Sequence, residues 1–194
     1  MAMRFQSPSG LSLHLLPAGA ALFRIHHAAT DPSRCSPLAP DITDGRGAAF
    51  GVLHAADSLE AAFVSLFLRT RARLIARAYA QQRMWTALSF SRPLRLVQWR
   101  DDAASSRVKA PALARREAIL SAFHASPHID GLAYRPDASN TGMTYVVFER
   151  ALKSGALREL DARRFDVCRD QVDELMRRGG AAWDESPTPG SPPA

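Results

Sequence analysis

The sequence predicts an α+β domain, in which helices pack against a curved sheet of mixed or largely antiparallel strands. Three observations lead to this class: short apolar runs typical of strands, segments whose apolar residues follow helical spacing, and the mixed order of the two along the chain. A chain of 194 residues is long enough for one well-buried domain. We expect this domain to cover residues 11–180, and we expect residues 181–194, with their Pro, Ser and Gly content, to form a disordered tail.

The first part of the domain is expected to consist of strands and a loop. Residues 11–16 are a weak strand candidate, and residues 21–26 are a better one because turn-forming residues flank them on both sides. Residues 31–47 contain three prolines and two glycines and predict a long loop, a kind of segment that is often functional in compact domains. The apolar run over residues 49–55 predicts a buried strand.

A helix is expected to follow directly. Asp57 is the predicted N-cap, and Glu60, three residues later, completes a capping box. The helical pattern continues to about Gln81, and its core-facing stripe consists of Leu59, Ala62, Phe63, Leu66 and Phe67.

The second half of the chain repeats both kinds of element. Strands are expected at 84–90, 94–99, 132–134 and 143–149. Helices are expected at 111–124 and 164–178. Pro111 suits the first turn of the earlier helix, and Gly179 with Gly180 ends the later one.

Composition and charge exclude several classes of function. No apolar run reaches the ~18 residues that cross a bilayer, and the first ten residues lack the order of a signal peptide, so we expect a cytoplasmic protein. The formal charge of +6 comes almost entirely from arginines that are spread along the chain. Their one local cluster is better explained as a solvated helix face than as a nucleic-acid site.

Metal and phosphate-loop motifs are missing from the sequence. Cys35 and Cys168 stand alone and indicate neither a disulfide framework nor a zinc site. The histidines have no accompanying Cys or Glu cluster, so no bound metal is expected. No G-x-G-x-x-G or P-loop occurs.

Three segments together resemble the RES domain, a family named for an Arg, a Glu and a Ser. They are L-F-R-I-H at 22–26, F-G-V-L-H-A-A-D-S-L-E-A-A-F-V-S-L-F-L-R at 50–69, and G-L-A-Y at 131–134. The resemblance covers roughly residues 20–150. It implies a core similar to that of ADP-ribosyltransferases, NAD or ADP-ribose as ligand with NAD as substrate, and an antitoxin protein as partner, because the family is known mainly as NAD-degrading toxins of bacterial toxin–antitoxin pairs.

Cleavage of the bond between nicotinamide and ribose has clear chemical needs. Positive charge builds on the sugar, and the transition state resembles an oxocarbenium ion, as in glycoside hydrolysis. The site therefore needs a carboxylate near the anomeric carbon and arginines that bind the pyrophosphate through charge-assisted hydrogen bonds. An aromatic side chain that packs on the base or ribose adds affinity.

The resemblance assigns binding roles to three residues. Arg24 matches the family's first Arg; otherwise it is an edge-strand Arg that faces solvent. The family's second Arg position falls on Ile42, so Arg46 is the nearest substitute unless it is only a turn residue. His54 stands where the family has a Tyr, and it either lines the nicotinamide or ribose side or is a satisfied histidine at a strand end.

The catalytic positions depart from the family pattern. The family's Glu lies seven residues after the Ser that opens the helix, and counting from Ser58 gives Ser65. Glu60 lies five residues too early and is explained by the capping box. The third signature position falls on Asp137, with Ser139 just beyond it. Three interpretations stay open: Ser139 is the shifted signature Ser, Asp137 is a substitute acid, or the segment is simply a turn.

Two main hypotheses follow. The first is an enzyme that cleaves the nicotinamide–ribose bond of NAD by phosphorolysis, hydrolysis or ADP-ribosyl transfer, with weakened activity. The second is a catalytically degenerate binding or regulatory module of the same fold. Under either, Arg24, His54 and Asp137 are expected to converge on one concave site. Ser65 is expected to point into that site while Leu66 and Phe67 pack toward the core.

Overall fold

A computed structural model describes most of the chain. The described residues are 4–6, 12–37, 51–68, 73–99, 119, 122, 126–135, 142–154 and 157–185. Among them, no helix is long and apolar enough to cross a membrane.

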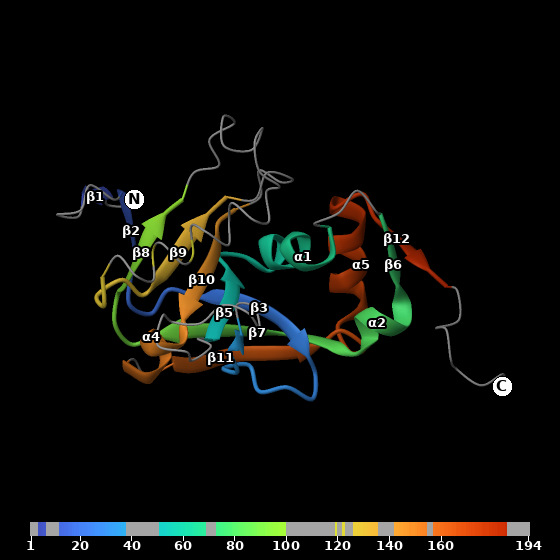
Figure 1. Cartoon of the computed structure of the whole chain (residues 1–194). Coiled ribbons are helices and arrows are strands. Elements are labelled where there is room, and N and C mark those ends of the chain that lie inside the picture. Colours follow the sequence, from blue (N-terminus) through green and yellow to red (C-terminus); the bar gives the residue numbers. More distant parts are fainter. Residues whose placement is uncertain are drawn as a thin grey trace.

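One large sheet dominates the described part of the fold (Figure 1). Its strands lie in the order β1 (Arg4–Gln6), β2 (Ser12–Leu16), β8 (Leu94–Gln98), β9 (Gly131–Tyr134), β10 (Thr144–Phe148), β5 (Gly51–Ala56), β3 (Leu22–His27), β7 (Arg83–Phe90) and β11 (Leu157–Arg164). The short strand β4 (Ser36–Pro37) also pairs with β5. Strands β8 and β9 are parallel and the other neighbours are antiparallel, so the predicted mixed α+β sheet is confirmed.

Strands β3 and β5 are neighbours in the sheet but pair at only one position, Phe23 with Ala56. Strand β3 pairs with β7 along its whole length, and β5 pairs with β10 over five residues. The two strands therefore separate beyond Phe23, and the residues that follow on β3 face a gap in the hydrogen-bond ladder.

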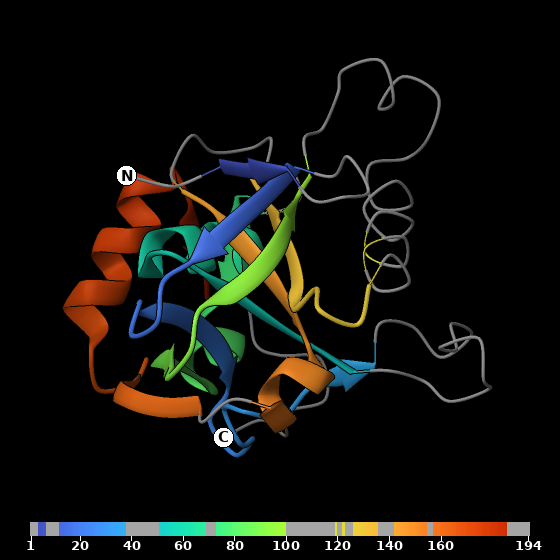
Figure 2. The ribbon, with the colours of Figure 1, turned by 90° about the vertical axis from the view of Figure 1, so that its left-hand side faces the viewer.

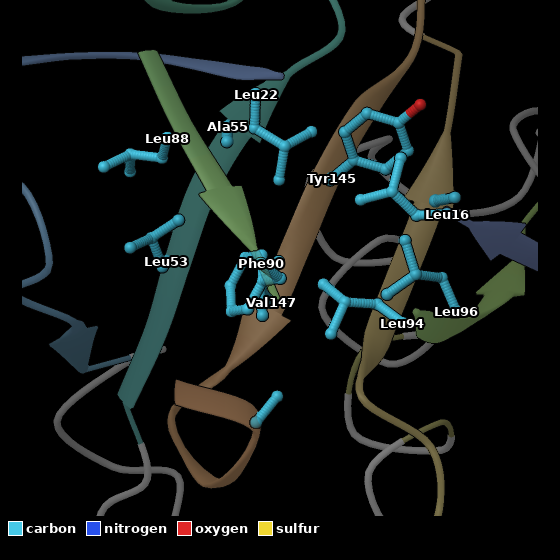
Figure 3. Packing of buried hydrophobic residues seen from close by; sticks show 12 residues of the cluster. Leu16, Leu22, Leu53, Ala55, Leu88, Phe90, Leu94, Leu96, Tyr145 and Val147 are labelled. Carbon is cyan, nitrogen blue, oxygen red and sulfur yellow. The ribbon is translucent and has the colours of Figure 1, made fainter. Parts of the chain in front are cut away.

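One face of the sheet carries an apolar cluster drawn from seven strands and helix α4 (Glu149–Ser154). Figure 3 shows side chains of β3, β5 and β7, such as Leu22, Leu53 and Leu88, beside those of β10. Leu22, Leu53 and Val147 are fully buried, as the alternation of apolar residues along the strands predicts. This cluster holds the two sides of the β3–β5 gap together through side chains.

The other face is covered by helix α1 (Leu59–Phe67), with α5 (Arg169–Arg178) beside it. In both views α5, drawn in red, lies next to α1 and away from α4 (Figure 1, Figure 2). Phe63 and Val64 of α1 pack with Val172 and Leu175 of α5 in one cluster. Helix α1 also packs on Phe23 and Ile25, which places it over the gap between β3 and β5.

The N-cap of α1 is Ser58, so the prediction of Asp57 was wrong. The Ser58 hydroxyl accepts a hydrogen bond from the Ala61 N–H at 3.1 Å. Glu60 is therefore not the capping-box residue; its carboxylate lies 3.7 Å from Arg178 Nη1. Asp57 instead joins β5 to β10: its carboxylate accepts a hydrogen bond from the Met143 N–H at 2.9 Å, and its own N–H donates to the Met143 carbonyl at 3.0 Å.

The first helix also ends earlier than predicted. It stops at Phe67, and strand β6 (Leu74–Ala76) and helix α2 (Arg77–Gln81) occupy the end of the segment that was expected to be helical. Strand β6 pairs in parallel with β12 (Ala182–Asp184), which lies inside the expected tail. The Trp183 ring packs against the cluster of α1 and α5, so the ordered part of the chain extends beyond residue 180.

The prediction also missed or displaced elements in the second half of the chain. Strand β11 occupies residues 157–164, and the last helix begins at Arg169 rather than at 164. The short helix α4 was not predicted. In the helix expected over 111–124, Ile119 and Ala122 are helical and buried, and the other residues lie outside the described part of the chain.

Candidate functional site

The gap between β3 and β5 opens into a cavity of about 250 Å³, which we call the Arg24 cavity. Strands β3, β5, β9 and β10 and helix α1 all border it. Its described lining consists of Phe23, Arg24, Ile25, Ser36, His54, Ala55, Ala62, Ser65, Leu66, Tyr134 and Thr144. Residues from four distant parts of the chain thus meet at one place.

Arg24 is the charged group of this cavity. The residue is only 9% exposed, and its Nη1 donates a hydrogen bond to the Pro32 carbonyl at 2.8 Å. Burial lowers the pKa of Arg24, and Cys35 and Asp31 oppose that shift. An arginine remains protonated in proteins all the same. This is the one hydrogen bond that the Arg24 guanidinium makes to the described residues.

His54 lies on β5 opposite Val146 of β10, and its side chain is exposed at the cavity. The alternation along β5 explains the position, because its neighbours Leu53 and Ala55 are buried on the other face. The structure therefore brings His54 and Arg24 to one cavity from opposite sides of the gap.

Ser65 reaches the Arg24 cavity from α1. Ala62 and Ser65 lie three residues apart on the same side of the helix, and both line the cavity. Leu66 was expected to pack toward the core, and this was wrong: it also lines the cavity and is 37% exposed. Phe67 packs with the core as expected, with its ring centroid 4.8 Å from that of Phe63.

Thr144 and Tyr134 line the cavity although the sequence analysis gave them no role. Thr144 faces Ala56 on one side and Tyr134 on the other in the strand register. Both residues are buried, and the Tyr134 ring contacts Trp99 at a centroid distance of 5.9 Å. Tyr134 ends the G-L-A-Y motif, a signal that could have identified it; nothing in the sequence distinguishes Thr144.

The remaining candidates Arg46, Asp137 and Ser139 lie outside the described residues. The expected convergence of Arg24, His54 and Asp137 can therefore be followed for the first two alone. Among the described lining residues no carboxylate is present.

A second cavity, of about 860 Å³, is lined in part by the segment that follows β3. The segment 32–37 borders both cavities, since Ser36 lines the smaller one and Cys35 and Pro37 line the larger. Glu149 of α4 accepts a hydrogen bond from the Gly51 N–H at 3.3 Å at its wall. Burial raises the pKa of the Cys35 thiol, so this cysteine is not an activated nucleophile.

Metal-ligating side chains do not gather in the described part of the chain. No group of three or more His, Cys, Asp or Glu residues there could hold a metal ion. The described lining of the Arg24 cavity offers a buried guanidinium, hydroxyl groups, an imidazole and two aromatic rings.

No protein-family model matches the sequence, and no curated protein matches it either. The fold is similar to that of a chain in the crystal structure of the M. tuberculosis MbcT–MbcA toxin–antitoxin complex, with a TM-score of 0.51 and 15% sequence identity. The similarity covers 84% of this chain and 92% of the other. At this identity the match shows the fold, and at that level it confirms the architecture that the resemblance to the RES domain implied.

Proposed function

We propose that the protein is a RES-type NAD-handling enzyme that cleaves the nicotinamide–ribose bond of NAD. The observation that carries the proposal is the meeting of Arg24, His54 and Ser65 at one cavity. These residues stand at three of the positions where the RES resemblance places its site, and the sequence separates them by up to 41 residues (65 − 24). If the short motifs resembled the family by chance, their residues would have no reason to line one cavity.

The proposed roles follow from the chemistry of each group. Arg24 binds the pyrophosphate through the N–H donors that Pro32 leaves free. His54 lies against the nicotinamide or ribose. The bond between ribose C1 and the ring nitrogen breaks, and nicotinamide leaves as a neutral molecule with the bonding electron pair. An oxygen of phosphate, water or an acceptor side chain bonds to C1, and a hydroxyl acceptor also releases a proton.

The activity is expected to be weak because Ser65 stands where the resemblance predicts a Glu. A hydroxyl cannot offer the developing cation the negative charge of a carboxylate. Electrostatic groups of this kind commonly contribute roughly 3–4 kcal/mol, or ~10²–10³ in rate. Asp137 is the proposed substitute acid, with Ser139 as the alternative signature residue, and Arg46 is the proposed second pyrophosphate ligand.

A second candidate function is a binding or regulatory module that recognises NAD or ADP-ribose without cleaving it. The observation that favours it is the described lining of the Arg24 cavity, which contains a buried cation but no carboxylate. Such a lining suits the binding of an anion better than the stabilisation of a second cation.

We further propose an antitoxin protein as partner and a cytoplasmic location. The support is the fold similarity to a chain of a toxin–antitoxin complex, together with the family resemblance of the sequence. Co-expression with the product of a neighbouring gene, followed by co-purification, tests this proposal.

Incubation of the purified chain with NAD, with free nicotinamide as the readout, tests the enzymatic proposal. Nicotinamide release above the uncatalysed rate supports the enzyme. Thermal-shift measurements with NAD and ADP-ribose complete the test, because a specific ligand stabilises the native state. Stabilisation without release would establish the binding module, and the absence of both would overturn the two candidate functions together.

A further inference from the structure

Thr144 carries a buried hydroxyl for which the described residues provide no hydrogen-bond partner. The residue lies on β10, a central strand of the large sheet, is 1% exposed, and borders the Arg24 cavity. Its Oγ1 is buried and makes no hydrogen bond to the described residues. A buried hydroxyl without a partner destabilises a folded protein, and such groups are rare in native structures.

Thr86 shows how the same fold treats a similar hydroxyl elsewhere. It is also fully buried in the sheet, on β7, but its Oγ1 lies 2.9 Å from His26 Nε2 and is hydrogen bonded. The contrast separates a threonine whose hydroxyl is bonded within the fold from one that borders a cavity and has no partner among the described residues. A partner for the Thr144 hydroxyl would therefore come from a molecule bound in the cavity.

The walls of the Arg24 cavity have two chemical characters. Arg24 provides a cation that suits a phosphate group. Ser36, Ser65, Thr144 and Tyr134 bring hydroxyl-bearing side chains to the rest of the lining. Neutral hydroxyl groups that both donate and accept suit a pentose, whose own hydroxyls do the same.

The size of the cavity fits part of a dinucleotide. Ligand sites for whole drug-sized molecules are typically ~300–1,000 Å³, and the Arg24 cavity holds about 250 Å³. One phosphate-linked sugar fits this space, with the phosphate at Arg24 and the sugar against the hydroxyl-bearing wall.

We propose that Thr144 is a specificity-determining residue whose hydroxyl hydrogen-bonds to the ribose beyond the pyrophosphate. This inference rests on the proposed function of NAD or ADP-ribose binding and names the residue that recognises the second ribose. The consequence is selectivity for ligands that carry this ribose: ADP-ribose binds more tightly than ADP because ADP ends at the phosphate.

Removal of the unpaired Thr144 hydroxyl should have opposite effects on the stability of the free protein and on ligand binding. Thr144→Val keeps the shape of the side chain and removes the oxygen. The free protein should melt at the same temperature or higher, because a buried polar group without a partner is gone. The affinity for ADP-ribose should fall about tenfold, because the ligand loses a hydrogen bond of roughly 1.4 kcal/mol.

Titration calorimetry with ADP-ribose and ADP tests the assignment. The proteins compared are the unmodified chain, Thr144→Val and Thr144→Ser, which retains the hydroxyl. We expect Thr144→Val to lose affinity for ADP-ribose and to keep its affinity for ADP, and we expect Thr144→Ser to remain within about threefold of the unmodified chain for both. Thr86→Val is the matched control: it should lower the melting temperature, because it removes a hydroxyl that has a partner.

The possible failures can be told apart. Binding of ADP-ribose by the unmodified chain with equal affinity in Thr144→Val would overturn the role of Thr144 and leave the proposed function in place. An equal loss of affinity for ADP and ADP-ribose would also overturn the assignment to the ribose. No binding of either nucleotide by the unmodified chain would overturn the proposed function, and this inference with it.

Discussion

Arg24 of strand β3 and Ser65 of helix α1 border the same cavity. Arg24 directly follows Phe23 on β3, and helix α1 packs on Phe23. The helix lies over the place where β3 and β5 separate, so a side chain of α1 and a side chain of β3 meet where the backbone ladder is interrupted. Both a buried cation and the position at which the resemblance to the RES domain predicts a carboxylate thus border this cavity.

Replacement of Arg24 should weaken nucleotide binding. Arg24→Ala removes a charge-assisted hydrogen bond, and we expect a loss of about 1.5–3 kcal/mol in the free energy of binding for NAD and ADP-ribose. Arg24→Lys should recover part of this loss, because it restores the charge but not the planar arrangement of donors. Titration calorimetry measures both. Arg158→Ala, an exposed arginine on β11 outside the cavity, is the control and should bind normally.

Introduction of a carboxylate at Ser65 should raise the activity. In Ser65→Glu, negative charge lies near the site where the oxocarbenium ion forms, so nicotinamide release should increase by about 10²–10³. A side-by-side NAD turnover assay of the two proteins measures the effect, and expression of the variant should become toxic to a host.

Ser65→Gln separates the charge from the size of the new side chain, and it should not raise the rate. Substantial activity in the unmodified chain that Ser65→Glu leaves unchanged would mean that another residue, with Asp137 the first candidate, already supplies the charge. No activity in any of the three proteins would favour the binding module.

The ion pair of buried Asp130 and half-buried Arg92 should stabilise the fold without affecting the site. Two hydrogen bonds of 2.6 and 2.9 Å join the carboxylate to the guanidinium, and the Arg95 N–H donates to the same carboxylate at 2.8 Å. These bonds fix the start of β9 beside β8. We expect Asp130→Ala to lower the free energy of unfolding by about 1.5–3 kcal/mol while the affinity for ADP-ribose stays the same.

Denaturant unfolding measures the effect of Asp130→Ala. Asp166→Ala provides the comparison, since Asp166 pairs with Arg164 at the surface, where ion pairs contribute little. Equal destabilisation by the two substitutions would contradict the special role of Asp130.

Acid should destabilise the protein through His26. This residue is 5% exposed; its Nδ1 lies 3.0 Å from the His27 carbonyl and its Nε2 lies 2.9 Å from Thr86 Oγ1. Burial lowers the pKa of His26 below its ordinary value, and the charge of Arg24 acts in the same direction. The unfolded chain therefore takes up a proton first, near pH 6.5. The stabilisation that comes from uncharged His26 is fully present above that pH, and it is lost as the pH falls toward the lower pKa of the folded state.

The melting temperature between pH 5 and 8 measures this loss. His26→Gln cannot gain a charge, so its melting temperature should start lower at pH 8 but fall less toward pH 5. Burial also lowers the pKa of His14, which leaves part of the acid sensitivity in the variant. Parallel curves for the two proteins would show that His26 does not contribute.

The strands that the sequence predicted correctly are those whose apolar residues become buried. Strands β7 and β10 are buried along almost their whole length, so their composition alone indicates them. Strand β11 has the sequence L-R-E-L-D-A-R-R and lies at the edge of the sheet, with most of its side chains exposed. Among the described strands its one partner is β7, and this tertiary pairing outweighs a composition that favours no strand.

The overextended first helix has a similar cause. Leu74–Ala76 can continue a helical pattern, and it becomes a strand because β12 lies beside it, more than a hundred residues later in the chain. The early N-cap prediction failed because Asp57 and Ser58 are both good caps, and the pairing of Asp57 with Met143 decides between them. Contacts between distant segments cannot be read from local propensity.

Sequence motifs marked three of the residues that line the Arg24 cavity, and the catalytic and binding roles given to them stay predictions. Arg24, His54 and Ser65 came from three family-like segments, and all three line one cavity. Thr144 was not predictable, because its distinguishing property is the missing partner of its hydroxyl, which depends on the packing around it.

The single-pair contact between β3 and β5 also bears on how cooperatively the protein unfolds. In the strand pairing of the described residues, the block β3–β7–β11 pairs with the rest of the large sheet at Phe23 and Ala56 alone. The two blocks therefore depend on side-chain packing to melt as one unit. A nucleotide in the Arg24 cavity would touch both blocks and act as a cross-link, so its binding should sharpen the thermal transition as well as raise its midpoint.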